Sequence, residues 1–295
     1  MTEFLIIGAG IAGLTLGREL SATFGADSVV LLEKSKGLGG RLATRRGEST
    51  RFDHGTPEIP PHTLALLGIS SGDFLFEGAT SLAKHLSLGL RVEKNQRVSR
   101  LTRDSSRWIL TTDEGKTHET RNLILTAPLP QALELLQGNA IRFPESLLSL
   151  HYEMAVVALL QGSGIHEEAS LVRFQDSELL TLANEQRKGI SAAPAWTVTF
   201  SPAWSKTHFE LSEDSLLNLA RETLQRRWPD FSGSIEIKKW RYSRPESSVP
   251  SSFEKITEAP ALYLAGDAFS IQEDSPGIER SIRSALALSR WLQNG

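Results

Sequence analysis

Residues 4–13 read FLIIGAGIAG, the pattern of a buried strand, a glycine-rich turn and the start of a helix. In such a turn Gly8 permits the tight bend, Gly10 lets the backbone approach a pyrophosphate, and Gly13 lets the helix pack closely on the strand. The free N–H groups and the dipole of the helix N-terminus attract phosphate. This stretch predicts a dinucleotide-binding fold.

An acidic residue stands at the expected distance from this turn. An apolar strand at residues 29–32 follows the helix, and Glu33 ends it 20 residues after Gly13. A carboxylate there can accept hydrogen bonds from both hydroxyls of a ribose. GxGxxG alone arises by chance in glycine-rich loops, but this one lies between a strand and a helix and precedes the acid. We therefore predict that Glu33 and Lys34 belong to the site.

Composition excludes several classes of function. The 295 residues carry a net charge of −3 and contain no cysteine, so disulfides, thiolate catalysis and cysteine-linked cofactors are excluded. The balanced charge favours neither nucleic acid nor an anionic membrane as a partner. The seven histidines show no metal-ligand spacing, so we predict no metal. No apolar run approaches the ~20 residues of a membrane span, and we expect a cytoplasmic protein.

A second glycine loop follows the acidic strand end at residues 34–41, KSKGLGGR. The adjacent Gly39 and Gly40 allow backbone N–H groups to face an anion, and Arg41 adds a charge-assisted contact. In isolation a basic surface turn explains the loop equally well. Beside the first motif, cofactor binding is the favoured interpretation.

Residues 51–55, RFDHG, read as a short strand that ends in glycine. His54 has two interpretations, a turn histidine or a residue packed against a bound ring system. In the second, Gly55 permits close approach of the ring. Residues 56–76 read as an irregular connection with little helix, and 78–88 as a helix.

The next block favours a flavin over a nicotinamide domain. It reads as an antiparallel meander with strands at 96–103, 107–112 and 116–120, followed by a buried return strand at 121–127. Val98 would lie where backbone groups can meet an adenine edge. Ala127 ends the return strand, before a proline.

From about residue 129 to residue 243 the pattern predicts a mixed sheet with a covering helix, as in a substrate domain. Its strands are predicted at 153–161, 179–183, 195–200 and 235–242, and its helix at 215–228. Trp240 and Tyr242, on a strand that leads toward the cofactor, are predicted to pack against substrate.

The end of the chain returns to the first sheet. Residues 261–267 form a buried strand that ends in Gly266 and Asp267, and a helix begins near Gly277 and Ile278. Asp267 can accept hydrogen bonds from a ribityl chain, and the helix dipole would favour negative charge on a reduced flavin. An ordinary strand–loop–helix is the alternative.

Both chain ends therefore contribute to one discontinuous domain. The predicted FAD-binding domain comprises 1–56, 77–128 and 244–295, and the predicted substrate domain comprises 57–76 and 129–243. The expected fold class is α/β, a Rossmann-type FAD-binding domain interleaved with a mixed-sheet α+β substrate domain.

Taken together, these motifs resemble the renalase branch of the flavin amine-oxidase-like proteins. The resemblance covers most of the chain and is most specific at GGRLATRR (39–46), FDHG (52–55) and KWRYS (239–243). It implies non-covalent FAD and a fold of the hydroxybenzoate-hydroxylase type. It also implies hydride transfer to the flavin, O2 as acceptor, hydrogen peroxide as product, and off-position dihydronicotinamide isomers rather than amines as substrates.

One segment departs from that family. After Gly55 the chain continues TPEIP (56–60), and the passage to Gly78 is shorter than in the family. In the family that passage forms part of the wall over the flavin. Its shortening hardly affects FAD binding, but it puts the identity of the substrate in doubt.

The sequence thus predicts an FAD-dependent oxidoreductase that transfers a hydride from a small dihydronicotinamide-like or amine-like substrate, with no nucleophile required. The alternatives are an FAD-binding protein with lost or altered catalysis and an NAD(P)-dependent dehydrogenase. No catalytic residue is singled out. The residues predicted to bind the cofactor are Gly8, Gly10, Ile11, Ala12, Gly13, Glu33, Lys34, Gly39, Gly40, Arg41, His54, Gly55, Val98, Ala127, Gly266, Asp267, Gly277 and Ile278.

Overall fold

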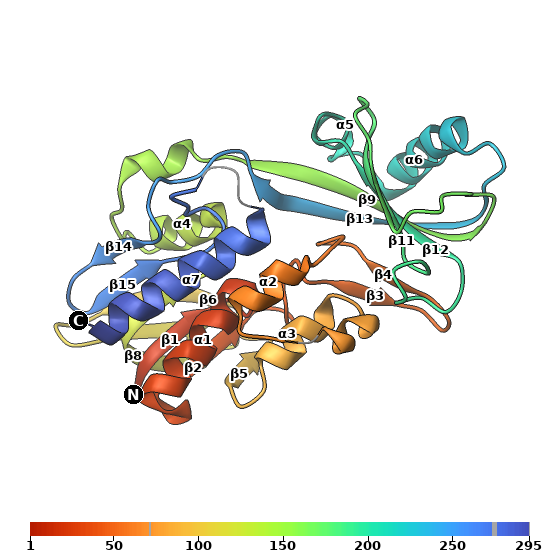
Figure 1. Cartoon of the computed structure of the whole chain (residues 1–295). Helices are drawn as coiled ribbons and strands as arrows, with labels where there is room; N and C mark the ends of the chain where they lie inside the picture. The colour runs from red at the N-terminus through yellow and green to blue at the C-terminus, as the bar shows by residue number, and fades with distance from the viewer. Residues whose placement is uncertain (71, 273–275, 295) are drawn as a thin grey trace.

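The computed structural model describes residues 1–70, 72–272 and 276–294. Two sheet-based units lie side by side in Figure 1, joined by the long strands β9 (Tyr152–Ser163) and β13 (Ser232–Pro245). Both chain termini lie on the first unit. The predicted convergence of the two chain ends on one sheet is therefore observed.

The first unit is built on an eight-stranded sheet with the order β14-β15-β8-β1-β2-β5, to which β6 and β7 attach beside β8. Strand β1 pairs in parallel with both β2 and β8, and β15 pairs in parallel with β8. This is the doubly wound arrangement that apolar strands buried on both faces adopt. The strands are β1 (Thr2–Ile7), β2 (Val29–Glu33), β5 (Arg91–Lys94), β6 (Val98–Arg103), β7 (Trp108–Thr112), β8 (Thr117–Leu125), β14 (Glu254–Thr257) and β15 (Ala261–Leu264).

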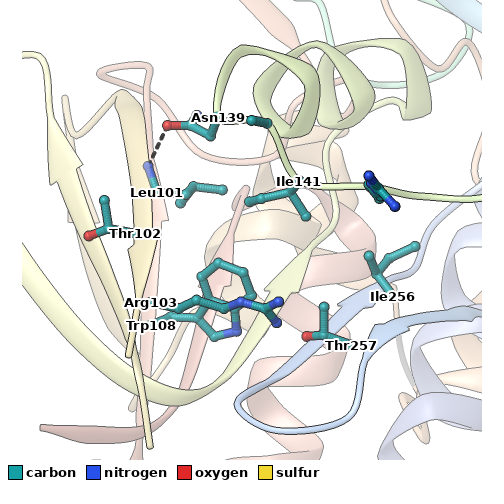
Figure 2. Close-up of a pocket in the computed structure, with 10 residues that line it drawn as sticks. Leu101, Thr102, Arg103, Trp108, Asn139, Ile141, Ile256 and Thr257 are labelled. Carbon is teal, nitrogen blue, oxygen red and sulfur yellow. Dashed lines mark hydrogen bonds between the residues drawn. The ribbon is translucent and has the colours of Figure 1, made fainter. Parts of the chain in front are cut away.

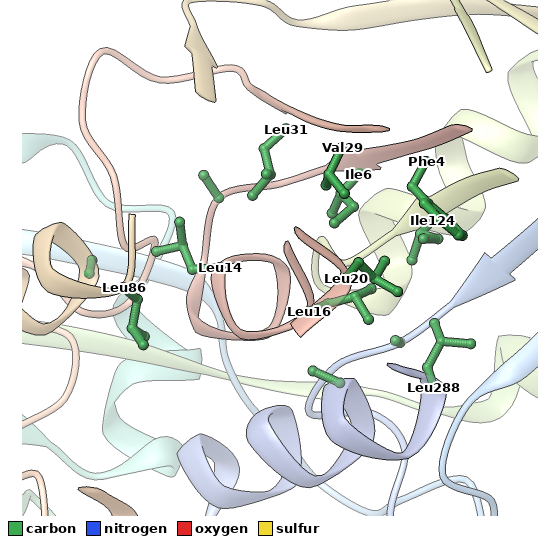
Figure 3. Close-up of a cluster of buried hydrophobic side chains, with 14 of the residues drawn as sticks. Phe4, Ile6, Leu14, Leu16, Leu20, Val29, Leu31, Leu86, Ile124 and Leu288 are labelled. Atoms are coloured by element: carbon green, nitrogen blue, oxygen red, sulfur yellow. The ribbon is translucent and has the colours of Figure 1, made fainter. Parts of the chain in front are cut away.

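Helices cover both faces of this sheet. On one face, α1 (Ile11–Phe24), α3 (Thr80–Leu86) and α7 (Gly277–Asn294) share a buried apolar cluster with β1 and β2. Figure 3 shows Leu16 and Leu20 of α1 beside Leu288 of α7. On the other face, α4 (Leu129–Gly138) packs against Leu5 and Val30. The packing fixes where α1 begins, and with it the glycine turn.

The second unit is a five-stranded antiparallel sheet with the order β10-β11-β12-β9-β13. One face packs against α5 (Pro202–His208) and α6 (Glu213–Arg227) through a cluster that includes Trp204 and Phe200. The opposite face receives Phe52, from the hairpin of β3 (Thr44–Arg46) and β4 (Arg51–Asp53). The remaining strands are β10 (Leu171–Arg173), β11 (Leu179–Asn184) and β12 (Ala195–Phe200). The hairpin thus links the chain after the second glycine loop to the second sheet.

Three details of the predicted elements were wrong. The second sheet, predicted to be mixed, is antiparallel throughout its described strands. The two strands expected at 116–120 and 121–127 are the single strand β8, because Thr120 pairs both with β7 and with β1. The connection expected to hold little helix contains α2 (Pro61–Leu66) and a 3-10 helix (Asp73–Glu77). Pro60 and Pro61 begin α2 rather than prevent it, since proline is tolerated at the first helical turn.

Packing also bears on the domain boundaries, which stay a prediction. Leu64 of α2 lies in the cluster under α1 and α7, and Leu129, Leu133 and Leu136 of α4 lie in the cluster on the opposite face of the same sheet. These contacts argue for assigning α2 and α4 to the first unit rather than to a substrate domain. Among the residues that the structure describes, no helix has the length and apolar character that a bilayer crossing requires.

Candidate functional site

The glycine turn is shaped to receive an anion. Gly10 caps α1 with extended backbone, and among the described residues no side chain bonds to the free amides of its first turn. A methyl group on Gly10 would meet no described heavy atom within 4 Å, whereas one on Gly13 would lie 2.0 Å from the Gly8 carbonyl oxygen. Gly13 therefore packs against the backbone of Gly8, whereas the space beside Gly10 is open. The turn fits the pyrophosphate of a dinucleotide.

Glu33 is held beside this turn. Its Oε2 accepts a hydrogen bond from Ala9 N at 2.9 Å, and its Oε1 accepts one from Ser35 N at 2.8 Å. A carboxylate oxygen has a second lone pair, so both oxygens keep acceptor capacity for ribose hydroxyls. Lys34 points elsewhere, since its Nζ donates to Gln131 Oε1 at 3.1 Å.

The second glycine loop lies directly on the first. Gly39 N donates to Ala9 O at 2.8 Å, and a methyl group on Gly40 would lie 3.6 Å from Gly10 Cα. Gly39 and Gly40 have φ values of 103° and 55°, which favour glycine. The two loops therefore form one surface at the start of α1.

Arg41 and Asp267, expected at different parts of the cofactor, are brought together. Arg41 NH1 lies 2.6 Å from Asp267 Oδ2 and also donates to Ser243 O at 2.8 Å. The Tyr152 hydroxyl donates to Asp267 Oδ1 at 2.9 Å. Burial and the Asp267 carboxylate raise the pKa of Tyr152, so its hydroxyl stays a donor. Burial opposes the charge of Arg41, but Asp267 outweighs it and raises the pKa of Arg41.

The helix predicted to face the flavin begins beside this group. A methyl group on Gly277 would lie 4.0 Å from Asp267 Oδ2, and Ile278 packs into the cluster under α1. Gly266, with φ of 140°, donates its N–H to Ser284 Oγ at 2.9 Å. Asp267 and the start of α7 are thus adjacent.

Val98 and Ala127 lie near the ends of the central strands. Val98 is buried in β6, two residues after Gln96, whose N–H donates to Glu33 O at 2.9 Å. Ala127 follows β8, and its N lies 3.4 Å from where a Gly8 methyl group would be. Both are therefore close to the residues expected to hold the adenosine half.

His54 and Trp240 form an aromatic pair between the two units. Their rings stack with centroids 5.5 Å apart, and Trp240 Nε1 donates to His54 O at 2.7 Å. Tyr242 meets Tyr152 edge to face at 5.9 Å. Gly55 packs against the backbone of Arg41, since a methyl group on Gly55 would lie 2.1 Å from Arg41 O. Its lack of a side chain therefore permits close approach of this backbone and not of a bound ring.

The imidazole of His54 is kept neutral. Its Nδ1 is buried and has no hydrogen-bond partner among the described residues. Burial, helped by the positive charge of Lys238, lowers the pKa of His54 to about 4. The ring is therefore neutral at neutral pH and a weak base.

We expect this shift to make the folded protein sensitive to acid. Between pH 6.5 and about 4 the unfolded chain protonates His54 and the folded chain does not, so this group makes stability fall as the pH falls through that range. NMR titration of the imidazole should give a midpoint near 4, and Trp240→Leu should move it toward 6.5 by admitting water. A wild-type midpoint near 6.5 would contradict this environment.

Sequence reasoning missed Tyr152 and Ser243. It also missed the ion pair between Asp53 and Lys188. Asp53 was visible within the FDHG motif, but Tyr152 begins a strand without any local signal. Two cavities lie away from the glycine loops. One of about 630 Å³ lies between the β6–β7 hairpin and the end of α4 (Figure 2), and one of about 240 Å³ includes Phe52 and Glu236.

Comparison with known proteins agrees with this geometry. Residues 61–290 match the model of the flavin containing amine oxidoreductases, and residues 6–64 match an NAD(P)-binding Rossmann-like domain. Renalase from Mus musculus is 23% identical over 351 aligned positions, which cover 99% of this chain and 100% of that protein. The alignment is longer than the 295 residues here, so the mouse protein has additional residues.

Solved structures share the fold at low identity. A protein provisionally described as a protoporphyrinogen oxidase, from Exiguobacterium sp. 255-15, has a TM-score of 0.72 at 14% identity, with 99% of each chain covered. A fatty acid isomerase from P. acnes has a TM-score of 0.62 at 13% identity, with 98% of each chain covered. The predicted α/β flavoprotein fold is confirmed, and the fold is one that supports more than one reaction.

Proposed function

The chain belongs to the flavin containing amine oxidoreductase family, and from this premise we propose that it oxidises a small, flat, reduced nitrogen heterocycle. The proposed substrate is an off-position dihydronicotinamide isomer, and the proposed acceptor is O2. FAD is the cofactor of this oxidoreductase, and the open Gly10 and the uncapped first turn of α1 fit its pyrophosphate. We propose that it is held without a covalent bond, and a bond to cysteine is excluded because the chain has none.

The observation that carries the proposal is the stacked pair of His54 and Trp240. We refer to these two rings, which lie next to the glycine loops, as the aromatic wall. Such a wall suits a flat substrate ring, because ring faces stack with favourable dispersion and quadrupole energies. The neutral His54 and the protonated Tyr152 provide no strong base, which suits a reaction that needs no proton abstraction.

Each element of the site has a role in this proposal. Bound FAD supplies a ring that accepts a hydride. The Gly10 turn and Glu33 hold the adenosine diphosphate half, and Asp267 with the start of α7 faces the ribityl side. The Arg41–Asp267 pair joins the second glycine loop to the segment that follows β15, and so fixes the position of one relative to the other. Trp240 and Tyr242 orient the substrate ring and exclude water.

Anaerobic stopped-flow mixing tests this function. The FAD-loaded protein should lose its visible flavin absorbance within seconds with an off-position dihydronicotinamide isomer and stay oxidised with benzylamine. Trp240→Leu should slow reduction by about tenfold to 100-fold, about 1.4–2.7 kcal/mol in barrier. Trp291→Leu, a matched change of a tryptophan that is 42% exposed, should have no effect. Reduction by the amine alone, or by neither compound, would overturn the proposed substrate.

A further inference from the structure

Three charged side chains outside the site described so far meet where the two units touch. Asp53 is 5% exposed and Glu185 is fully buried, and Lys188 lies between them. Lys188 Nζ is 3.1 Å from Asp53 Oδ2 and 2.8 Å from Glu185 Oε2. We refer to Asp53, Lys188 and Glu185 as the junction cluster. Charges are retained in a protein interior only when they are paired in this way.

The junction cluster is anchored on both sides. On the first unit, Asp53 Oδ1 accepts from Thr44 Oγ1 at 2.7 Å and from Ala79 N at 2.8 Å, just before α3. On the second unit, Glu185 Oε1 accepts from the Thr197 hydroxyl of β12. The same oxygen accepts from Asp53 N at 3.1 Å across the junction. A shift of Glu185 therefore acts directly on the backbone of β4.

That backbone leads straight into the aromatic wall. His54 follows Asp53, its ring stacks on Trp240, and its carbonyl accepts the Trp240 indole N–H. Gly55 then packs on the backbone of Arg41, which pairs with Asp267. We propose that Glu185 is a positioning residue: through Lys188 and Asp53 it sets where the His54–Gly55 turn lies against Trp240, and so sets the position of the aromatic wall against which the substrate ring packs. The part of this that concerns substrate rests on the proposed function.

The charge on Glu185 supports such a role. Burial, reinforced by Asp53 and opposed by Lys188, raises the pKa of Glu185 to about 7. Burial alone would lower the pKa of Lys188, but Glu185 and Asp53 raise it, so this ammonium stays charged. Lys188 and Asp53 are thus the charged groups that face Glu185. Arg51 of β4 donates to Ile190 O in the turn that carries Lys188, and its own ion-pair partner is Glu77.

Protonation of Glu185 changes what Lys188 can bind. Above pH 7 the ammonium lies between two carboxylates, and below it only the Asp53 carboxylate attracts it. Because the folded protein holds this proton more tightly than the unfolded chain, the contribution of Glu185 to stability falls as the pH rises from 4.5 through about 7. The position of β4, and with it the aromatic wall, is therefore expected to change across neutral pH.

The test is a pH titration of the visible spectrum of FAD bound to the full chain, from about pH 5.5 to pH 8.5, with KM for the dihydronicotinamide isomer measured in parallel. Wild type should show a spectral inflection near pH 7 and a KM that changes about threefold to tenfold across it. Glu185→Gln, which is neutral at every pH, should lack the inflection. Glu58→Gln removes an exposed ion pair between the same two units, with Arg173, and should retain it.

A second variant keeps the proposal testable if Glu185→Gln does not fold. Thr197→Val removes a hydroxyl that stabilises ionised Glu185, so the inflection should move upward by about one pH unit. An inflection that survives in Glu185→Gln, that stays in place in Thr197→Val, or that is lost in Glu58→Gln would overturn the proposal. The spectrum needs no turnover, so a protein that shows the inflection but does not oxidise the isomer contradicts the proposed substrate and not the positioning role.

Discussion

Gly10→Ala is expected to weaken flavin binding strongly while the protein folds normally. A methyl group at this position meets no described heavy atom within 4 Å, so the fold accommodates it. In the complex, the same methyl group occupies the space through which the pyrophosphate approaches the backbone. The dissociation constant for FAD, measured by quenching of flavin fluorescence on titration with apoprotein, should rise at least about 100-fold, or about 2.7 kcal/mol.

Two companion variants make this result specific. Gly138→Ala also places its methyl group in open space, at the end of α4 and away from the glycine loops, and should leave FAD affinity unchanged. Gly13→Ala should lower the stability of the protein itself, because its methyl group would lie 2.0 Å from Gly8 O. Tight FAD binding by Gly10→Ala would show that the phosphates do not lie at this turn.

Asp267→Asn is expected to destabilise the apoprotein by about 3 kcal/mol in the free energy of unfolding, measured by urea denaturation. The change leaves the Arg41 guanidinium without its carboxylate and weakens the bond from Tyr152. Asp267 is 3% exposed, but the Arg41 side chain is 26% exposed, so water offsets part of the loss. For that reason we expect the lower end of the range for buried pairs.

A surface ion pair provides the matched control. Glu178→Gln removes a carboxylate that lies 2.6 Å from Arg226, but both side chains are about half exposed. Such pairs contribute little, so the free energy of unfolding should change by less than about 1 kcal/mol. Equal effects of Asp267→Asn and Glu178→Gln would mean that the Arg41–Asp267 pair does not join the two parts of the site.

Local patterns were sufficient to predict the nucleotide-binding half. Each signal depends only on residues close together in the sequence: the glycine spacing, the acidic Glu33 and the apolar strands. The elements β1, α1 and β2 form as those signals predict. The residues 129–138 also carried a helical period, with Leu129, Ala132, Leu133 and Leu136 on one face. Such a period is typical of a helix, but it does not indicate on which of the two units the helix packs.

The contacts within the site could not be predicted in the same way. Arg41 and Asp267 are 226 residues apart, and Asp53 and Lys188 are 135 apart. Their pairing depends on how the β3–β4 hairpin docks on the second sheet, which no local period encodes. A lysine in a turn, such as Lys188, has the same sequence signature whether it is solvated or buried between two carboxylates.

The most direct test of the account is the visible absorption spectrum of the purified protein, recorded before and after the protein is denatured and removed. The account predicts a yellow protein that releases one FAD per chain into solution, because we propose that the glycine loops, Glu33 and the start of α7 hold the cofactor without a covalent bond. A colourless protein that also fails to take up added FAD would contradict it.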